Sequence, residues 1–394
     1  MKSRNLGVAW ALCGLALLVS ALLPSAGVFA ASGEKGASSS SSDSSDNGNA
    51  STRKPRTVPH WSSSFTDPTN RVEYPFTIVG SDPSLGQSTT VDTTIVPLRF
   101  EFVAGALDGA DNVADTIASP VFTPTSFAIS GDSGVQFGDA FARAQFGKVG
   151  TGYHVILGQP RVSETVTIQV PESQGVAVLS PLGVMVGRVD STWFKARLAA
   201  IIDEMNLKPT ILPIFLTNNV GLYSDASHLR CCILGGHGAG SPASDAPISL
   251  AGKDKIRTFV FAAYLTPNGF SRNPAISDIH ALSHEIAEWI DNPFGINVVQ
   301  PYQIPTAPGA PEACSAALET GDPLVGVAVP VWGNPSAAAG FYWHPQDELF
   351  LNWFARDGED PGLAPAPLQY TFAGPMTVAM GGPFAAFGHI AQAC

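Results

Sequence analysis

HALSHEIAEWIDNPFG, at residues 280–295, decides the fold of the C-terminal half, because its polar and apolar side chains recur with a helical period. Ser277 is a good N-cap, and Pro293 with Gly295 ends the pattern, so the sequence predicts a helix over about residues 278–292. The apolar stripe that would face a core consists of Ile279, Leu282, Ile286 and Ile290. At roughly 100° per residue, one narrow polar line consists of His280, His284, Glu288 and Asp291.

Within this predicted helix, the motif HExxE is a variant of the zinc-protease motif HExxH. A carboxylate is an ordinary zinc ligand at about 2.0–2.2 Å, so His284 and Glu288 would both bind the metal. Glu285, about a quarter-turn from the polar line, would remain the general base that activates water. Two alternatives stay open. The polar line is a solvated helix face, or His280 and His284 form the ligand pair, which leaves Glu285 and Glu288 without roles.

Two other stretches carry polar residues of the same kind. His237 lies in the Gly-rich LRCCILGGHGAG (229–240), and Glu319 and Asp322 lie in SAALETGDPLVG (315–326). Taken singly, His237 also fits a flexible loop, and the two acids also fit a turn, because TGDP has a turn-forming composition.

In chain order these motifs are Cys-x-x-x-Gly-x-His, Ser-His-Glu-x-x-Glu, Asn-Pro and Glu-x-x-Asp, and this order resembles the Exordium-like (phosphate-induced) secreted proteins and their bacterial relatives. The resemblance covers about residues 176–356. The matching positions are His237, His284, Glu285, Glu288, Asn292, Pro293, Glu319 and Asp322. Asp291 stands where that family usually has threonine, and Leu324 stands where it has a cysteine. The resemblance implies a secreted, cell-wall- or growth-related protein related to metallopeptidases.

Together, the stretches offer His284, Glu288 and one of Glu319, Asp322 or His237 as ligands. One histidine with two carboxylates neutralises a divalent cation and also tolerates Mn²⁺, Fe²⁺ or Ca²⁺. With His237 as the third ligand, the set becomes His₂Glu, which is closer to the zinc site of a protease. Asp322 would then orient His284 from outside the ligand set. Zinc is the metal that the sequence favours.

Composition limits the class of protein. The chain has 394 residues, 45% of them hydrophobic and 14% charged, which is enough apolar material for a large core. The net charge of -12 argues against nucleic acid as a partner, since no basic patch is available to contact phosphates. Residues 1–30 predict a secretory signal peptide, with a membrane anchor as the alternative, and no later segment is predicted to span a membrane. Residues 31–58 are rich in Ser and Gly and predict a disordered tether.

The rest of the chain predicts two domains. Short β-type runs between turns over residues 59–175 predict a small antiparallel β-sandwich. Residues 176–394 predict an α/β (α+β) domain, since a helix over 191–205 with Ser191 as its cap alternates with buried strands over 210–217 and 258–266. The motif HExxE and the resemblance to the Exordium-like proteins imply that this domain is zincin-like.

Four cysteines follow the predicted signal peptide, which in an exported chain predicts disulfide bonds. Adjacent Cys231 and Cys232 are expected to pair with more distant partners, with Cys314 and Cys394 available. Cys231 or Cys232 with His237 as a thiol nucleophile is the weaker alternative.

The sequence thus predicts an exported metal-dependent hydrolase, most simply a peptidase, that acts on a polypeptide or cell-wall substrate. The alternative is a non-catalytic secreted or wall-associated binding protein, in which the same residues form a structural metal site or a relic of one.

Overall fold

The structure is a computed structural model that describes residues 56–127, 133–146, 152–224, 231–241, 250, 255–304, 313–335, 340–356 and 370–372. The predicted signal peptide and nearly all of the predicted tether lie outside the described residues, as does Cys394. None of the helices among the described residues is long and apolar enough to cross a membrane.

A mixed sheet of eight strands forms the centre of the fold, in the order β15-β16-β12-β3-β4, with β7, β8 and β9 also paired to β3. Pairing along β16, β12 and β3 is parallel, whereas the edge strand β15 runs antiparallel to β16. The bounds are β3 Ser88–Phe102, β4 Gly105–Asp108, β7 His154–Leu157, β8 Arg161–Val162, β9 Val166–Gln169, β12 Ile211–Asn218, β15 Gly235–Ala239 and β16 Thr258–Tyr264.

The long strand β3 joins the two regions that the sequence analysis separated. One of its edges pairs in parallel with β12, and the other pairs in parallel with β7, β8 and β9 in turn. The sheet therefore crosses the boundary predicted after residue 175. The predicted antiparallel sandwich over residues 59–175 is wrong in this form, because β3 pairs mainly with parallel partners and one of them, β12, lies beyond that boundary.

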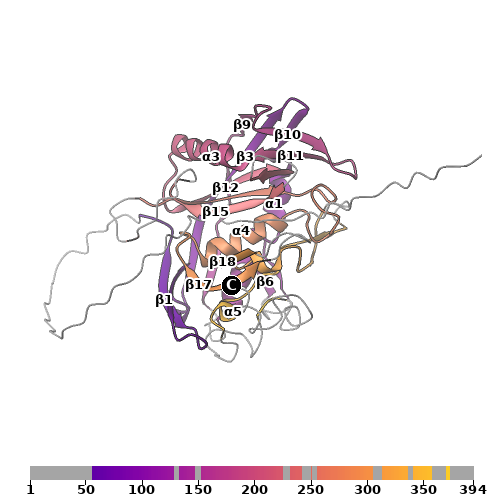
Figure 1. Ribbon diagram of the computed structural model, residues 1–394. Coiled ribbons are helices and arrows are strands. Elements are labelled where there is room, and N and C mark those ends of the chain that lie inside the picture. The colour runs from indigo at the N-terminus through magenta and orange to yellow at the C-terminus, as the bar shows by residue number, and fades with distance from the viewer. Residues whose placement is uncertain are drawn as a thin grey trace, which may run out of the picture.

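Two helices cover opposite faces of this sheet (Figure 1). Helix α3 spans Ser191–Met205, as predicted, and helix α4 spans His280–Asp291. Alternate side chains of β12 and β16 point to opposite faces of the sheet, and a helix covers each face, so both strands are buried on both sides. Phe215, Phe259 and Phe261 pack with α3, whereas Ile214 and Val260 pack with α4. The predicted buried strands over 210–217 and 258–266 are thus confirmed as β12 and β16.

The caps of both helices differ from the prediction. The side chain of Asp190 accepts a hydrogen bond from the Trp193 amide at 2.8 Å and caps α3, so Ser191 is the first helical residue instead of the cap. At α4, the hydroxyl of Ser277 donates to the Pro274 carbonyl, and the Asp278 carboxylate accepts from the Ile279 amide at 2.6 Å. The helix begins two residues later than predicted, because Asp278 has a positive φ of 45° that the helix cannot include.

The remaining elements surround this core. Among the described residues, a four-stranded sheet has the order β10-β11-β13-β14, and four further sheets have two strands each. The strands are β1 His60–Thr66, β2 Glu73–Val79, β5 Thr125–Ser126, β6 Ser133–Val135, β10 Gly175–Leu179, β11 Met185–Asp190, β13 Val220–Tyr223, β14 Cys231–Ile233, β17 Val298–Ile304, β18 Ala313–Ala317, β19 Val331–Trp332 and β20 Tyr342–Trp343. The other helices are α1 Val113–Ala118, α2 Phe137–Ala144 and α5 Leu351–Phe354, with 3-10 turns η1 Pro83–Leu85, η2 Gly109–Asn112 and η3 Asp322–Leu324.

Candidate metal centre

Helix α4 is buried along its whole length, which is unusual for a helix with so many ionisable residues. It lies between the sheet, where it contacts β15 and β16, and helix α2. Gly138 of α2 permits this approach, because a Cβ there would lie 2.9 Å from Ile290. His284 and Glu288 are 0% exposed, so the solvated helix face that the sequence left open is wrong.

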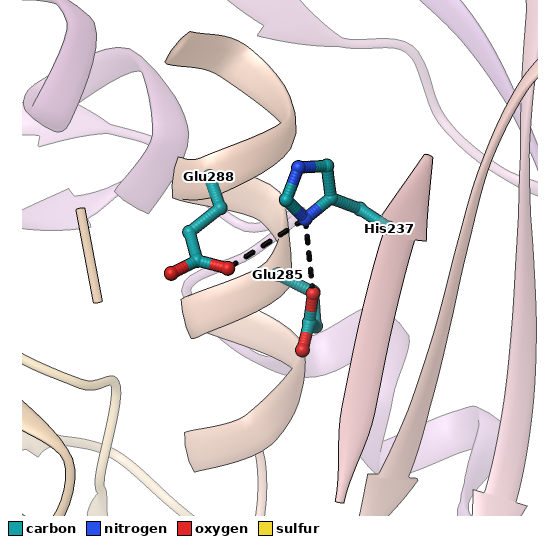
Figure 2. Close-up of side chains that lie close together, drawn as sticks. All are labelled: His237, Glu285 and Glu288. Atoms are coloured by element: carbon teal, nitrogen blue, oxygen red, sulfur yellow. Dashed lines mark hydrogen bonds and ion pairs between the residues drawn. The ribbon is translucent and has the colours of Figure 1, made fainter. Parts of the chain in front are cut away.

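His237 reaches the helix from the edge strand β15 (Figure 2). Its Nδ1 lies 3.2 Å from Glu285 Oε2 and 3.6 Å from Glu288 Oε2. On the same helix, His284 Nε2 lies 3.1 Å from Glu288 Oε2 and 3.9 Å from Glu285 Oε1, and it lies 4.0 Å from Asp322 Oδ1 of the turn η3. The structure therefore brings the predicted residues together around Glu288.

These contacts form two possible ligand groups. Ligand atoms of His237, Glu285 and Glu288 lie within 4.8 Å of one another, and so do those of His284, Glu288 and Asp322. We call them the His237 triplet and the His284 triplet. Each contains one imidazole and two carboxylates, and Glu288 belongs to both.

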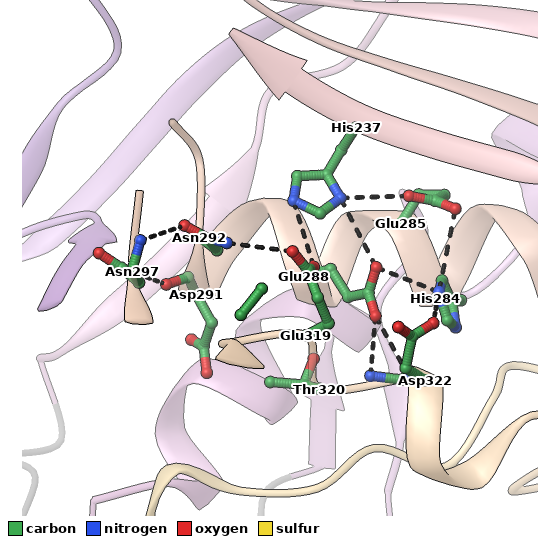
Figure 3. A network of polar contacts seen from close by, with 12 residues as sticks. His237, His284, Glu285, Glu288, Asp291, Asn292, Asn297, Glu319, Thr320 and Asp322 are labelled. Atoms are coloured by element: carbon green, nitrogen blue, oxygen red, sulfur yellow. Dashed lines mark hydrogen bonds and ion pairs between the residues drawn. The ribbon is translucent and has the colours of Figure 1, made fainter. Parts of the chain in front are cut away.

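Glu288 is held in place by the chain segment that follows β18 (Figure 3). Its Oε1 accepts hydrogen bonds from the amides of Gly321 at 3.1 Å and Asp322 at 3.3 Å. Because two backbone donors use Oε1, Oε2 is the oxygen that remains for the histidines. The backbone of residues 321–322 thus orients the carboxylate, as a metal ligand requires.

Glu319 lies on the other side of the His237 ring from the two glutamates of α4. His237 Nε2 is 3.6 Å from Glu319 Oε2, and Glu319 Oε1 accepts a hydrogen bond from Asn292 Nδ2 at 3.1 Å. A histidine that binds a metal through one nitrogen commonly donates from the other to a carboxylate. Glu319 fits that orienting role toward His237, whereas Asp322, which was predicted to orient His284, faces the Nε2 of His284.

Several atoms of the site are buried without a hydrogen-bond partner. They are His284 Nδ1 and Nε2, Glu285 Oε1, Glu288 Oε2 and Glu319 Oε2. His284 Nε2 and Glu288 Oε2 are close, but the geometry of a hydrogen bond between them is absent. An unsatisfied buried polar atom costs about 1–3 kcal/mol, and more if it is charged. Imidazole nitrogen and carboxylate oxygen are the donor set for a borderline or hard divalent cation, so the residues fit such an ion.

Burial and mutual charge determine the protonation of these groups. Burial lowers the pKa of His284, but Glu288 and Glu285 outweigh burial and raise it above the usual value. Burial raises the pKa of Glu288, but the charge of His284 outweighs burial and lowers it. Burial, together with the charge of Glu288, raises the pKa of Glu319 and of Asp322 well above the ordinary range. So many carboxylates in one place need protons or cations to neutralise them.

Two glycines leave room for the ionisable side chains. A Cβ on Gly235 of β15 would lie 2.5 Å from Glu285 Oε1, and a Cβ on Gly321 would overlap His284 Nδ1. Neither position has a positive φ, so the requirement is for space rather than for backbone freedom. Any larger residue would displace a side chain of the site.

Sequence reasoning missed Glu348, which lies fully buried beside the cluster. Its Oε2 accepts a hydrogen bond from Thr320 Oγ1 at 3.2 Å, its Oε1 has no partner, and its charge acts on His284. Burial raises the pKa of Glu348 well above its usual value. The signal was present in YWHPQDELFLNWFAR (342–356), where acids stand among aromatic residues that predict a core.

Other polar residues of the predicted line lie outside the cluster. His280 Nε2 accepts from the Gly326 amide at 3.3 Å, and burial lowers the pKa of His280 to about 3. Asp291 points away toward helix α2, where Gln145 Nε2 donates to it at 2.8 Å. Neither belongs to a ligand triplet, so a His280–His284 ligand pair is not what the structure assembles.

The cysteines differ from the prediction. The structure joins Cys231 to Cys232 in a disulfide, whereas the sequence analysis expected each to pair with a more distant partner. Cys314, one of those partners, lies on β18, which pairs with β17 rather than with the sheet of β14, and it is itself disulfide-bonded. With both thiols of residues 231–232 oxidised, neither is a nucleophile for His237.

No protein-family model, curated protein or solved structure matches this chain. The resemblance to the Exordium-like proteins therefore remains a prediction from the motifs. What the structure shows by itself is a mixed α+β fold with a buried group of histidines and carboxylates that fits a metal ion.

Proposed function

We propose that this protein is an exported, zincin-like, metal-dependent hydrolase whose divalent cation, zinc in the first instance, binds at His284 and Glu288 of α4. The observation that carries the proposal is the convergence of buried, unpaired imidazole and carboxylate atoms at Glu288 Oε2. A hydrogen-bonded core would pair such atoms with one another or with the backbone. Asp322 completes the ligand group of this ion, and His237, whose other ring nitrogen faces Glu319, lies near the same oxygen of Glu288 from strand β15.

A bound divalent cation supplies Lewis-acid polarisation of a substrate carbonyl and makes water more acidic. The chain contributes the base and the electrostatics. Glu285 Oε1 has no hydrogen-bond partner and lies 3.9 Å from His284 Nε2, which places it beside the cation without a competing contact. Glu285 is therefore placed to accept a proton from the attacking water as the general base.

The substrate class rests on the sequence. The predicted export signal and the resemblance to secreted, wall-related proteins favour a polypeptide or cell-wall substrate. The motif HExxE favours a peptide bond, because the related motif HExxH serves peptide hydrolysis.

Metal analysis of the purified full chain tests the proposal. We expect bound divalent metal after dialysis, and we expect His284→Ala to lose the ion of its triplet. The matched control is His154→Ala, since His154 pairs with Asp139 away from the site and its loss should leave metal content unchanged. Wild-type protein that contains no metal, and that takes up none from Zn²⁺ solution, would overturn the proposal.

An activity assay tests the reaction separately. Glu285→Gln keeps the shape of the side chain but removes the base, so the ion held by His284 stays while hydrolysis of an unfolded, fluorescent polypeptide falls by about 10²–10⁴-fold. Full activity in that variant would remove Glu285 from its catalytic role.

A non-catalytic metal-binding protein is the second candidate. The observation that favours it is burial, because His237, His284, Glu285, Glu288 and Glu319 are all at most 2% exposed, whereas a substrate must reach the ion. Metal bound in the full chain, with no cleavage of unfolded polypeptide or of isolated cell-wall material, would favour this candidate over the hydrolase.

A further inference from the structure

We propose that the cluster holds two divalent cations, one in each triplet, with Glu288 as the carboxylate between them. The inference rests on the proposed function, since both require that the cluster binds metal, but it assigns a second site that a single-ion hydrolase lacks. The His284 triplet holds the first ion, and the His237 triplet holds the second.

The position of Glu288 Oε2 is the first argument. Backbone amides occupy Oε1, and Oε2 lies 3.1 Å from His284 Nε2 and 3.6 Å from His237 Nδ1. Atoms bound to one zinc ion at about 2.0–2.2 Å in a tetrahedron lie roughly 3.3–3.6 Å apart. Both separations are close to that value, so the same oxygen has ligand spacing toward an imidazole in each triplet.

The second argument is that each triplet has three ligands of its own kind, one histidine and two carboxylates, and that Glu288 is the residue they share. The His237 triplet adds Glu285 Oε2, which lies 3.2 Å from His237 Nδ1, and the His284 triplet adds Asp322 Oδ1. Glu285 Oε1 stays directed toward His284, so Glu285 can bind the second ion through one oxygen and face the first ion with the other. Paired ions of this kind in hydrolases lie about 3.5–4 Å apart and share ligands.

The ring of His237 is oriented for this role. Its Nδ1 faces the triplet, and its Nε2 faces Glu319 Oε2 at 3.6 Å. Metal-binding imidazoles commonly have a carboxylate behind the second nitrogen, which fixes the tautomer. Asn292 holds Glu319 from its other oxygen, so the support extends to the end of α4.

Charge is the third argument. Five carboxylates are buried in or beside the cluster, and the residues are Glu285, Glu288, Glu319, Asp322 and Glu348. One divalent cation balances two of them, whereas two cations balance four. Because an uncompensated buried carboxylate is costly, these acids need protons or cations, and a second cation would neutralise two more of them than a single ion does.

Stoichiometry with Zn²⁺ alone tests the inference. After chelation, the full chain is loaded with Zn²⁺, dialysed, and its zinc counted against protein. We expect two equivalents in the wild type and in the control His154→Ala. We expect one equivalent in His237→Ala, whose substitution removes a ligand of the second triplet only.

Mn²⁺ provides a readout that does not depend on how well a variant folds. Two Mn²⁺ ions joined by a carboxylate give a spin-coupled electron paramagnetic resonance spectrum in the wild type, whereas a single ion gives an isolated six-line pattern. One equivalent of Zn²⁺ with the isolated Mn²⁺ pattern in the wild type would overturn the second site and leave the proposed function intact. No bound metal at all would overturn both.

Discussion

The two faces of the central sheet solve different problems with the same strands. On the α3 face, Phe194 and Leu198 pack against the rings of Phe259 and Phe261, and the cluster is apolar. On the α4 face, apolar residues of the same strands lie beside a buried set of histidines and carboxylates. Burial of a large apolar side chain stabilises a fold by about 1.5–3 kcal/mol, whereas burial of an unpaired charge destabilises it. The α3 face thus stabilises the fold, whereas the buried ionisable residues of the α4 face lower the stability of the metal-free chain and form a site.

The contrast between the apolar α3 face and the polar α4 face would fail most clearly if the polar cluster needed no ligand. We expect chelation to lower the melting temperature of the full chain, because loss of an ion present at 1,000 times its dissociation constant removes about 4 kcal/mol of stabilisation. Differential scanning calorimetry with and without a chelator measures this change. Identical melting curves in both conditions would mean that the cluster is a self-sufficient hydrogen-bonded core.

The apolar face is tested by a cavity. Leu198→Ala removes a fully buried side chain of α3, so we expect a loss of about 2–5 kcal/mol in the free energy of unfolding with no change in metal content. Leu182→Ala is the matched control, because Leu182 is 52% exposed and its truncation should change little. A lower metal content in folded Leu198→Ala would show that the two faces are coupled.

Asp291 lies on α4 but outside the cluster, and it makes the stability of the α4 face depend on pH. Burial raises the pKa of Asp291 to about 8, with Gln145 opposing the shift, while the unfolded value is near 3.8. The native state therefore keeps a proton that the unfolded chain releases, and stability falls as pH rises from about 4 to about 8. The slope is at most about 1.4 kcal/mol per pH unit. Asp291→Asn should remove this slope in denaturant titrations at several pH values, and parallel pH profiles of variant and wild type would contradict it.

The smallest expected effect is at the start of α3. Asp190→Ala removes the side-chain acceptor of the Trp193 amide, so we expect a loss of about 1 kcal/mol in unfolding free energy. Asp203→Ala, an exposed acid near the other end of the same helix, is the control. Equal effects of the two substitutions in urea denaturation would show that the cap adds nothing beyond a surface charge.

Local pattern in the sequence predicted local structure well, because side-chain periodicity survives without tertiary information. The helix over residues 191–205 and the two buried strands are confirmed. The boundary after residue 175 could not be read, since nothing in the composition of β3 shows that it pairs with β12 more than a hundred residues later. Long-range pairing is determined by the whole core, which a window of residues does not contain.

The candidate site was predictable in part for the same reason. HExxE placed His284, Glu285 and Glu288 on one helix, and the chain order of the motifs suggested His237, Glu319 and Asp322. The sequence could not predict that Glu285 and Glu288 face one nitrogen of the His237 ring while Glu319 faces the other. This arrangement depends on how β15 lies over α4. Glu348 was missed because its only signal is an acid among aromatic residues, which indicates burial but not its neighbours.

The glycines of β15 have a consequence for the whole arrangement. In GGHGA, Gly236 and Gly238 lie against the rings of Phe261 and Phe259, and His237 points to the other side. A shift of β15 by one residue along β16 would turn the imidazole into the phenylalanine layer, where only hydrogen fits. Because the two phenylalanine rings fill the space beside Gly236 and Gly238, a shifted register of β15 on β16 is sterically excluded. The packing of these glycines against the phenylalanine rings therefore sets the register of β15 on β16 without a bound ion.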